Sequence, residues 1–243
     1  MDYFQRMVGQ VRRCVDDYAM FAPGDSVAVG VSGGKDSLLT LAALAALRRY
    51  YPAPFTLRAF TVDCGFPDMD FGPVADWIAA LDVPYEIIKT DIREIVFDVR
   101  KEPNPCSLCA KLRRGALNSA ALAAGCNKVA LGHHLDDAVN TFLLSWLYEG
   151  RLSCFEPVTH LDRSGVTQIR PLLYVPERDV VGLTRRLSLP VVKSTCPSDR
   201  DSKRREVQAL ASALAKEYPD FKERTFRAIQ RLPLPGWEKP AGT

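Results

Sequence analysis

The sequence contains no run close to the roughly 18 consecutive apolar residues that a membrane-spanning helix needs, although 47% of its 243 residues are hydrophobic. Its opening stretch, Met1 to Arg6, also lacks the basic and then apolar layout of a secretory signal peptide. Both absences argue against insertion into a membrane or export through one. We therefore expect a cytoplasmic protein that has no membrane partner.

An excess of one charge is also missing, since 32 basic and 29 acidic side chains leave a net charge of +3. Such a small excess gives no overall field that would hold a nucleic acid. Any nucleic-acid partner has to be bound by local basic clusters instead. Two clusters are present, one of Lys111, Arg113 and Arg114 and one of Lys203 to Arg205, although a run of charges often marks only a solvated helix face.

A disulfide framework is not expected, because seven cysteines are an odd number and disulfides rarely persist in the cytoplasm. The cysteines are better examined for metal-ligand spacing. Cys106 and Cys109 form a C-x-x-C pair, and Cys196 lies far downstream, directly before a proline. The others are expected to be small buried hydrophobes, with Cys64 as the exception to watch because it follows a predicted strand end: Cys14, Cys64, Cys126 and Cys154.

One glycine-rich turn stands out, because the apolar run Val27 to Val31 leads into Ser32-Gly33-Gly34-Lys35-Asp36-Ser37 and then into a helical pattern. Gly33 and Gly34 let the backbone turn tightly and bring its N–H groups against an anion. The following helix start adds the positive end of its dipole, and Lys35 adds a full charge. Asp36 and Ser37 supply oxygens that can reach Mg²⁺. The pattern predicts a phosphate-binding loop.

This loop is not the Walker A loop of kinases and GTPases, because Val29 replaces its first glycine and Asp36 replaces its Ser or Thr. An ordinary glycine-rich turn is the alternative interpretation. The run from Ser32 to Ser37 resembles instead the S-G-G-x-D-S loop of the PP-loop ATP pyrophosphatase superfamily. That resemblance implies cleavage of ATP between its α and β phosphates and adenylation of a substrate oxygen.

Predicted strands and helices alternate along the chain, which indicates an α/β fold with a doubly wound parallel sheet and helical elaborations. The PP-loop resemblance implies the adenine nucleotide alpha hydrolase-like class of this fold. Three polar stretches follow predicted strands, namely Ser32 to Ser37, Asp63, and Gly132 to His134. Ligands gather at the carboxyl ends of parallel strands, so we expect these stretches to meet at one edge. The predicted strands are Val27–Val31, Thr56–Val62, Val83–Lys89 and Asn127–Leu131. The predicted helices are Met7–Phe21, Leu38–Tyr51, Phe71–Leu81, Ile92–Arg100, Leu108–Ala124 and Phe142–Tyr148.

A second polar cluster, Gly132-His133-His134-Leu135-Asp136-Asp137, runs into an apolar helix. Taken alone, Asp136 and Asp137 are acidic residues that the helix dipole favours near its N-terminus. Together with the glycine-rich loop, the G-H-H-x-D-D run resembles the tRNA 2-thiocytidine synthetase branch of the PP-loop enzymes. It is also similar to the tRNA-lysidine synthetases. Members often carry Glu where this chain has Asn140.

The cysteines distinguish these two branches. By spacing alone, Cys106 and Cys109 fit a redox pair, which the lack of a thioredoxin-like context disfavours, or a zinc site completed by Cys154 or His134. The thiocytidine resemblance implies that Cys106, Cys109 and Cys196 hold a [4Fe-4S] cluster and leave one iron open. Lysidine synthetases lack this trio, and Cys-Pro is a familiar context for a cluster ligand.

The resemblance implies an ATP-dependent tRNA 2-thiolation sulfurtransferase that forms AMP and pyrophosphate. It would adenylate the C2 oxygen of an anticodon-loop cytidine and replace it with sulfur delivered at the cluster. Lys35 and Asp36 would act on ATP and Mg²⁺, and Asp136 or Asp137 would handle protons. The residues implied to bind ATP or Mg²⁺ are Ser32, Gly33, Gly34, Lys35, Asp36, Ser37, Asp63, Gly132 and His133.

The partners implied are tRNA and a sulfur donor, either a cysteine desulfurase or sulfide, and the resemblance allows a homodimer. We expect an N-terminal helix over 1–23, interpreted as a lid or substrate-facing arm, a PP-loop ATPase and thiolation domain over 24–217, and a C-terminal helix and tail over 218–243. The alternatives are adenylation of another tRNA base or small metabolite, and a non-catalytic ATP-binding module. Release of AMP separates the last of these from an enzyme.

Overall fold

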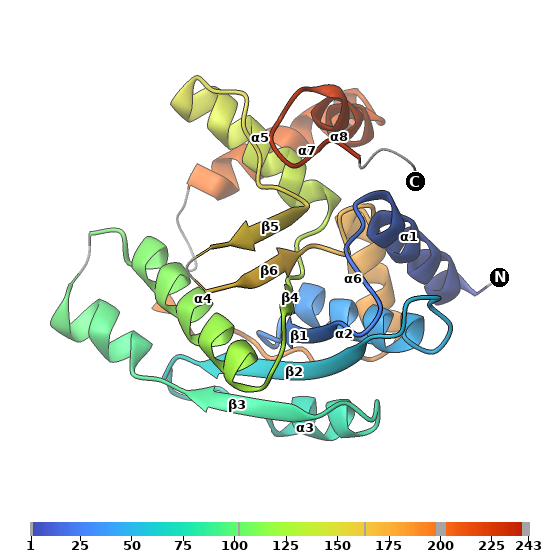
Figure 1. Ribbon diagram of the computed structural model, residues 1–243. Coiled ribbons are helices and arrows are strands. Elements are labelled where there is room, and N and C mark those ends of the chain that lie inside the picture. The colour runs from blue at the N-terminus through green and yellow to red at the C-terminus, as the bar shows by residue number, and fades with distance from the viewer. Residues whose placement is uncertain (1, 102, 163, 198–202, 240–243) are drawn as a thin grey trace.

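The computed structural model describes residues 2–101, 103–162, 164–197 and 203–239. Its centre is a six-stranded sheet of order β3-β2-β1-β4-β6-β5 (Figure 1). Every neighbouring pair is parallel except β5 with β6. The strands are β1 (Ser26–Gly30), β2 (Thr56–Asp63), β3 (Tyr85–Lys89), β4 (Lys128–Ala130), β5 (Val158–Leu161) and β6 (Val166–Ile169).

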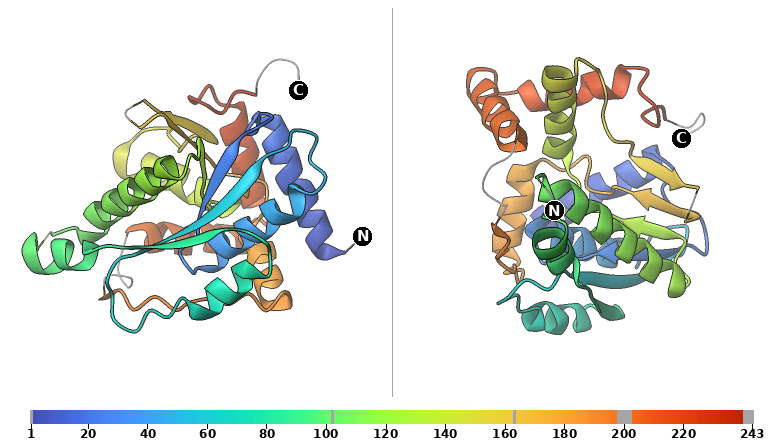
Figure 2. Two further views of the ribbon diagram at one scale, coloured as in Figure 1. Left: turned by 60° about the horizontal axis from the view of Figure 1, so that its bottom comes forward. Right: turned by 90° about the vertical axis from the view of Figure 1, so that its left-hand side faces the viewer.

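Helices cover both faces of this sheet, with α4 on one face and α1, α2 and α6 on the other (Figure 1, Figure 2). Helices α5, α7 and α8 pack against one another at the side of the molecule opposite α3 and β3 (Figure 2, right). The helices are α1 (Tyr3–Asp17), α2 (Lys35–Leu47), α3 (Gly72–Ala79), the π-helix η1 (Glu94–Val99), α4 (Pro105–Ala123), α5 (Leu135–Glu149), α6 (Glu177–Arg186), α7 (Lys203–Glu217) and α8 (Phe221–Arg231).

The alternation of side chains along β1 divides the apolar interior into two main clusters. Val27 and Val29 belong to the larger one, which α1 and α2 also fill. Ala28 points to the opposite face and packs in a smaller cluster with Leu117 of α4. Successive residues of a strand point to opposite faces, so a strand buried on both sides is apolar throughout, as β1 is.

The chain order places a topological switch point between β1 and β4. From β1 the chain moves outward through β2 to β3 and then returns to pair β4 with the other side of β1. Crevices at such a point, outside the carboxyl ends of the strands, are where open α/β sheets bind ligands. The glycine-rich loop follows β1 and the Gly132–His134 turn follows β4, so both predicted polar stretches lie there.

The structure confirms the α/β fold with a mostly parallel sheet, and it differs from the expectation in several places. Helix α5 begins at Leu135 rather than Phe142. The edge hairpin of β5 and β6 was not predicted, and it makes one edge strand antiparallel. Helix α4 begins at Pro105 rather than Leu108, which puts the C-x-x-C pair inside its first turns. The short helix predicted over Ile92–Arg100 is the π-helix η1.

The interpretation of the first helix as a lid was wrong. Val8, Val11 and Val15 of α1 are fully buried in the larger apolar cluster, which also contains Trp237 near the other end of the chain. A helix whose apolar face is buried in this way belongs to the core. In the part of the chain that the structure describes, no helix is both long and apolar enough to cross a bilayer.

Candidate active site

Hydrogen bonds between the Ser37 hydroxyl and the backbone hold the loop between β1 and α2 in a tight turn. Ser37 Oγ accepts a hydrogen bond from the Ser32 N–H at 3.1 Å and donates one to the Gly34 carbonyl at 2.9 Å. Gly33 has a φ of +79°, and a Cβ there would lie 2.9 Å from Cβ of Val192, so only glycine fits. The first N–H groups of α2 have no acceptor within the helix. The loop therefore has the geometry of a phosphate cradle.

Two carboxylates hold the ammonium of Lys35. Its Nζ lies 3.1 Å from Asp36 Oδ1 and 3.2 Å from Oε1 of Glu177, the first residue of α6. Burial lowers the pKa of Lys35, but the two carboxylates outweigh burial, so the pKa is raised and the side chain stays charged. Nζ also donates a hydrogen bond to Asp36 Oδ2 at 3.2 Å. The Asp36 carboxylate therefore lies at the phosphate-binding loop, and carboxylate oxygens are ligands that Mg²⁺ takes.

A cleft of about 770 Å³ opens at the switch point. Ser32, Asp36 and Ser37 line it from the loop after β1. The turn after β4 approaches this loop so closely that a Cβ at Gly132 would lie 2.9 Å from the carbonyl carbon of Asp36. The two glycine-containing stretches therefore form one continuous wall. Asp63, the last residue of β2, does not line the cleft, although Val62 before it does. Its carboxylate accepts the N–H of Gly65 at 2.9 Å.

Asp137 is the aspartate of the second motif that lines the cleft. It accepts the N–H of His134 at 3.1 Å and a hydrogen bond from Arg204 Nη2 at 2.9 Å. Burial raises its pKa, but the neighbouring His134 and Arg204 outweigh that effect, so the pKa is lowered. Asp137 is therefore an ionised carboxylate at the cleft wall, where it can contact a bound ligand.

Asp136 has a different setting, although it is adjacent in the chain. It is buried, and its carboxylate accepts the N–H of Glu177 at 2.7 Å and the ammonium of Lys222 at 2.5 Å. These contacts join α5 to the starts of α6 and α8. The geometry therefore assigns contact with a ligand to Asp137 and a structural connection to Asp136.

His133 faces the cleft with a neutral ring. Burial, with a contribution from the charge of Arg170, lowers the pKa of His133 to about 4. Its ring lies 5.0 Å from the ring of Phe155, and its Nδ1 is buried without a hydrogen bond to any described residue. At neutral pH this imidazole can donate or accept one hydrogen bond but carries no charge.

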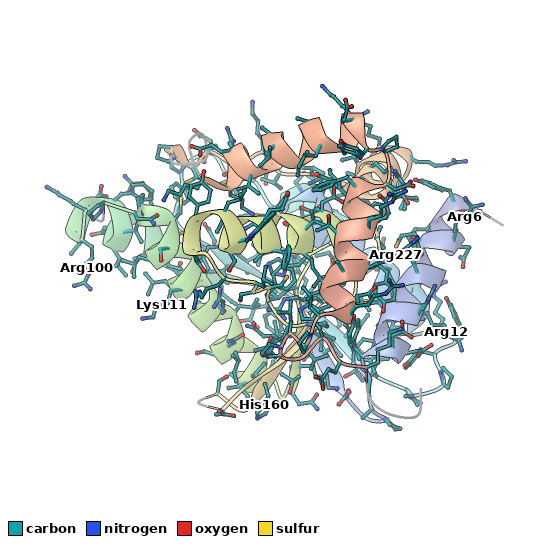
Figure 3. The ribbon with its side chains drawn as sticks, turned by 90° about the horizontal axis from the view of Figure 1, so that it is seen from above. Arg6, Arg12, Arg100, Lys111, His160 and Arg227 are labelled. Atoms are coloured by element: carbon teal, nitrogen blue, oxygen red, sulfur yellow. The ribbon has the colours of Figure 1, made fainter. Side chains whose placement is uncertain are left out.

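Four arginines line the same cleft, and both predicted basic clusters contribute to them. Arg113 and Arg114 come from α4, Arg204 from α7, and Arg170 from the residue after β6. Seen from above, the neighbouring Lys111 of α4 lies on the opposite side of the molecule from α1 with Arg12 (Figure 3). The cleft is therefore bordered by positive charge on the α4 side, where RNA phosphates could approach.

Cys109 and Cys64 lie together in a small apolar cluster between α4 and the loop after β2. A hydrogen bond from Cys64 lowers the pKa of the Cys109 thiol below its ordinary value and raises that of Cys64. Cys109 therefore favours the thiolate form, which is the form that ligates metals. Cys106 precedes it by one helical turn and is exposed.

Cys196 reaches the same region along a different segment. The hydroxyl of Thr195 donates to the carbonyl of Pro67 at 2.9 Å, so this segment touches the loop that carries Cys64. Within the described ranges, no three His, Cys, Asp or Glu side chains converge closely enough to hold a metal. Thiolate donors suit an iron–sulfur cluster, and ligation by Cys106, Cys109 and Cys196 stays a prediction.

The sequence analysis assigned no role to Glu177, Arg170 or Lys222. Arg170 had a detectable signal, since a charged residue directly follows the apolar end of a strand. Lys222 had none, because it lies 86 residues from its partner Asp136. Of the remaining cysteines, Cys126 is buried as expected, whereas Cys154 lines the cleft.

Comparison with known proteins agrees with this geometry. The PP-loop domain family matches residues 5–211. The tRNA-cytidine(32) 2-sulfurtransferase of Pelobacter propionicus is 38% identical over 94% of this chain and 86% of its own length, and that of Geobacter sulfurreducens is 38% identical over 93% and 89%. The U34-tRNA thiolase NcsA from Methanococcus maripaludis, solved with its [4Fe-4S] cluster, has a TM-score of 0.76 and 27% identity over 94% of this chain and 78% of that chain. The chain therefore belongs to the PP-loop domain family, among the tRNA-cytidine(32) 2-sulfurtransferases.

Proposed function

We propose that this protein is an ATP-dependent tRNA sulfurtransferase that replaces the C2 oxygen of cytidine 32 with sulfur. The observation that carries the proposal is that one cleft is lined by the phosphate-binding loop, by the Gly132–His134 turn and by Asp137 at the start of α5. The similarity supports cytidine over uridine, because the cytidine enzymes are 38% identical and the U34 thiolase 27%.

Activation of the base uses ATP, because the C2 oxygen of cytidine is a poor leaving group. The C2 oxygen attacks the α phosphorus of ATP, a new O–P bond forms, and the bond to the β phosphate breaks to release pyrophosphate. Lys35 and the first N–H groups of α2 stabilise the charge that develops on pyrophosphate. Asp36 and Ser37 offer the oxygens that would hold Mg²⁺.

Replacement of the activated oxygen completes the reaction. A sulfide nucleophile adds to C2, the C2–O bond breaks, and AMP leaves with the oxygen. Asp137, ionised and at the cleft wall, accepts the proton that the attacking sulfur loses. When bound at Cys106, Cys109 and Cys196, a [4Fe-4S] cluster would supply a place to hold sulfide beside the cleft. An anticodon-loop base suits this site because unpaired bases can be turned out into a pocket.

The remaining partners follow from this chemistry. The acceptor is tRNA, and the sulfur comes from a cysteine desulfurase or from sulfide. We further propose that the protein acts in the cytoplasm. A homodimer is compatible with the proposal, and sedimentation of the purified protein tests it.

The test of the activation step is AMP release. Purified protein with ATP and unmodified tRNA transcript should form AMP and pyrophosphate only when the tRNA is present. Formation of AMP with a small thiolated metabolite or free base in place of tRNA would show that the acceptor is that molecule rather than tRNA. Binding of ATP without any AMP would identify a non-catalytic nucleotide-binding module instead.

A further inference from the structure

Arg170 is a buried arginine with an incomplete set of partners. Only 7% of its surface is exposed, yet it lines the active-site cleft. One nitrogen, Nη1, donates to the carbonyl of Glu156 and to Thr159 Oγ1 at 3.0 Å. The buried Nε donates to no described residue. Buried polar groups are normally paired, so this guanidinium has donor capacity left for a ligand.

The charge of Arg170 is also left without an ion-pair partner among the described residues. Glu156 lines the same cleft and its charge attracts Arg170, but the hydrogen bond from Arg170 is accepted by the backbone carbonyl of Glu156. Burial raises the pKa of the neighbouring Cys154 thiol to about 12, so Cys154 brings no negative charge. The guanidinium instead lies 5.0 Å from the centre of the Phe155 ring. A buried cation without a directly paired counter-charge is costly, and an anionic ligand bound to it would reduce that cost.

The position of Arg170 separates it from the loop that holds ATP phosphates. The loop follows β1 and Arg170 follows β6, with β4 between them. Strands in a sheet are roughly 4.8 Å apart, so the ends of β1 and β6 are about 10 Å apart. Arg113 and Arg114 line the same cleft. The part of the cleft that contains Arg170, Arg113 and Arg114 therefore suits an anion other than the phosphates of ATP.

We propose that Arg170 binds a backbone phosphate of the tRNA next to the nucleotide that enters the cleft. The inference rests on the proposed function and adds a phosphate site to it. A guanidinium matches a phosphate with parallel N–H donors, and its fixed fork also orients the ligand. The hydrogen bonds to Glu156 and Thr159 hold the fork in place before RNA arrives. The neutral imidazole of His133, which also packs against Phe155 and lines the cleft, can add one uncharged hydrogen bond.

The test compares tRNA binding by the wild-type protein and by Arg170→Gln at several salt concentrations. Loss of a charge-assisted contact should weaken binding of an unmodified tRNA transcript by about tenfold or more. The slope of log Kd against log salt should fall by about 0.7 to 0.9, the contribution of one phosphate. Binding of a non-hydrolysable ATP analogue without tRNA should stay unchanged. The control is Arg12→Gln, because Arg12 is exposed on α1 and its ion pair is with Asp16 of the same helix. This variant should change neither the affinity for tRNA nor the salt slope.

Unchanged tRNA affinity and slope in Arg170→Gln would overturn the inference. Weaker binding of the ATP analogue with normal tRNA binding would assign the phosphate to ATP and also overturn it. If Arg170→Gln does not fold, Arg170→Lys decides. That variant keeps the charge and hence the salt slope, but it loses the fork and should bind tRNA several-fold more weakly; wild-type affinity would contradict the proposal.

The proposed function is judged separately in the same samples. Wild-type protein that binds tRNA but forms no 2-thiocytidine contradicts the function, while the slope difference still decides the phosphate site. Wild-type protein that does not bind tRNA contradicts both.

Discussion

Lys35 and Glu177 form an ion pair of 3.2 Å that joins the phosphate-binding loop to the first turn of α6. The backbone N–H of the same glutamate donates to Asp136. Glu177 thus connects the loop after β1 with the second motif after β4, although the three residues are far apart in the chain. The ammonium is held at the loop before any phosphate arrives, which is the preorganisation that stabilises a developing charge.

Replacement of Lys35 by alanine should remove most tRNA-dependent AMP formation, by about a hundredfold or more. The stability cost should be below about 1 kcal/mol, because this ion pair is partly exposed. The measurements are AMP release and urea unfolding. Arg12→Gln serves as the control and should keep full AMP release, because Arg12 is an exposed charge on α1 that pairs with Asp16 of the same helix. Undiminished AMP release by Lys35→Ala would show that the lysine is not part of the machinery.

The two adjacent aspartates should respond in opposite ways. Asp136→Asn leaves Lys222 without its buried partner and should lower the free energy of unfolding by about 2–3 kcal/mol. Asp137→Asn should cost about 1 kcal/mol or less but reduce thiolation by about a hundredfold, the usual contribution of a general base. Denaturant unfolding and a single-turnover thiolation assay measure the two effects. Equal losses of stability in both variants would contradict the assignment.

These two residues also show how far the sequence alone could be interpreted. The glycine-rich loop and the G-H-H-x-D-D run were predicted correctly as strand-end features, because strand, turn and helix start are local patterns. The separate roles of Asp136 and Asp137 were not predictable, because they depend on Lys222 and Arg204, which come from helices much later in the chain.

The errors have the same origin. Strands β5 and β6 have four residues each, too few for a clear period. The amphipathic pattern of α1 indicates that one face is buried but does not say against what, and so it was interpreted as a lid. The pairing of Cys64 with Cys109 depends on α4 packing against the loop after β2. No spacing in the sequence reports that contact.

Stability should fall in mild acid because of His133. Its pKa is about 4 in the folded protein and about 6.5 in an unfolded chain. Between these values the unfolded state binds more protons, so the free energy of unfolding decreases as pH falls from 6.5 toward 4. From pH 7 to pH 5 the loss should be about 2 kcal/mol. Asp137 does not contribute in this window, because its lowered pKa acts below 3.8.

Urea unfolding at pH 7 and pH 5 measures this loss. His133→Gln should lose about 2 kcal/mol less between the two pH values than the wild-type protein. The same pH dependence in both proteins would mean that another group is responsible.

The cysteine assignment predicts a coloured protein. Anaerobic reconstitution with iron and sulfide should give visible iron–sulfur absorbance in the wild-type protein and not in Cys106→Ala or Cys196→Ala. Cys126→Ala is the matched control, because Cys126 is buried beside Leu117 and Ala121, at the end of α4 away from the C-x-x-C pair. A colourless protein that binds zinc at the same cysteines, with activity that survives air, would replace the cluster with a zinc site.

The central claim is that the protein introduces sulfur at C2 of a tRNA cytidine. Mass spectrometry of nucleosides from the tRNA of a strain deleted for this gene measures that product directly. The account predicts that 2-thiocytidine is absent from the deletion strain and restored by the intact gene but not by the Lys35→Ala variant. Normal 2-thiocytidine in the deletion strain, or loss of a thiolated uridine in its place, would contradict it.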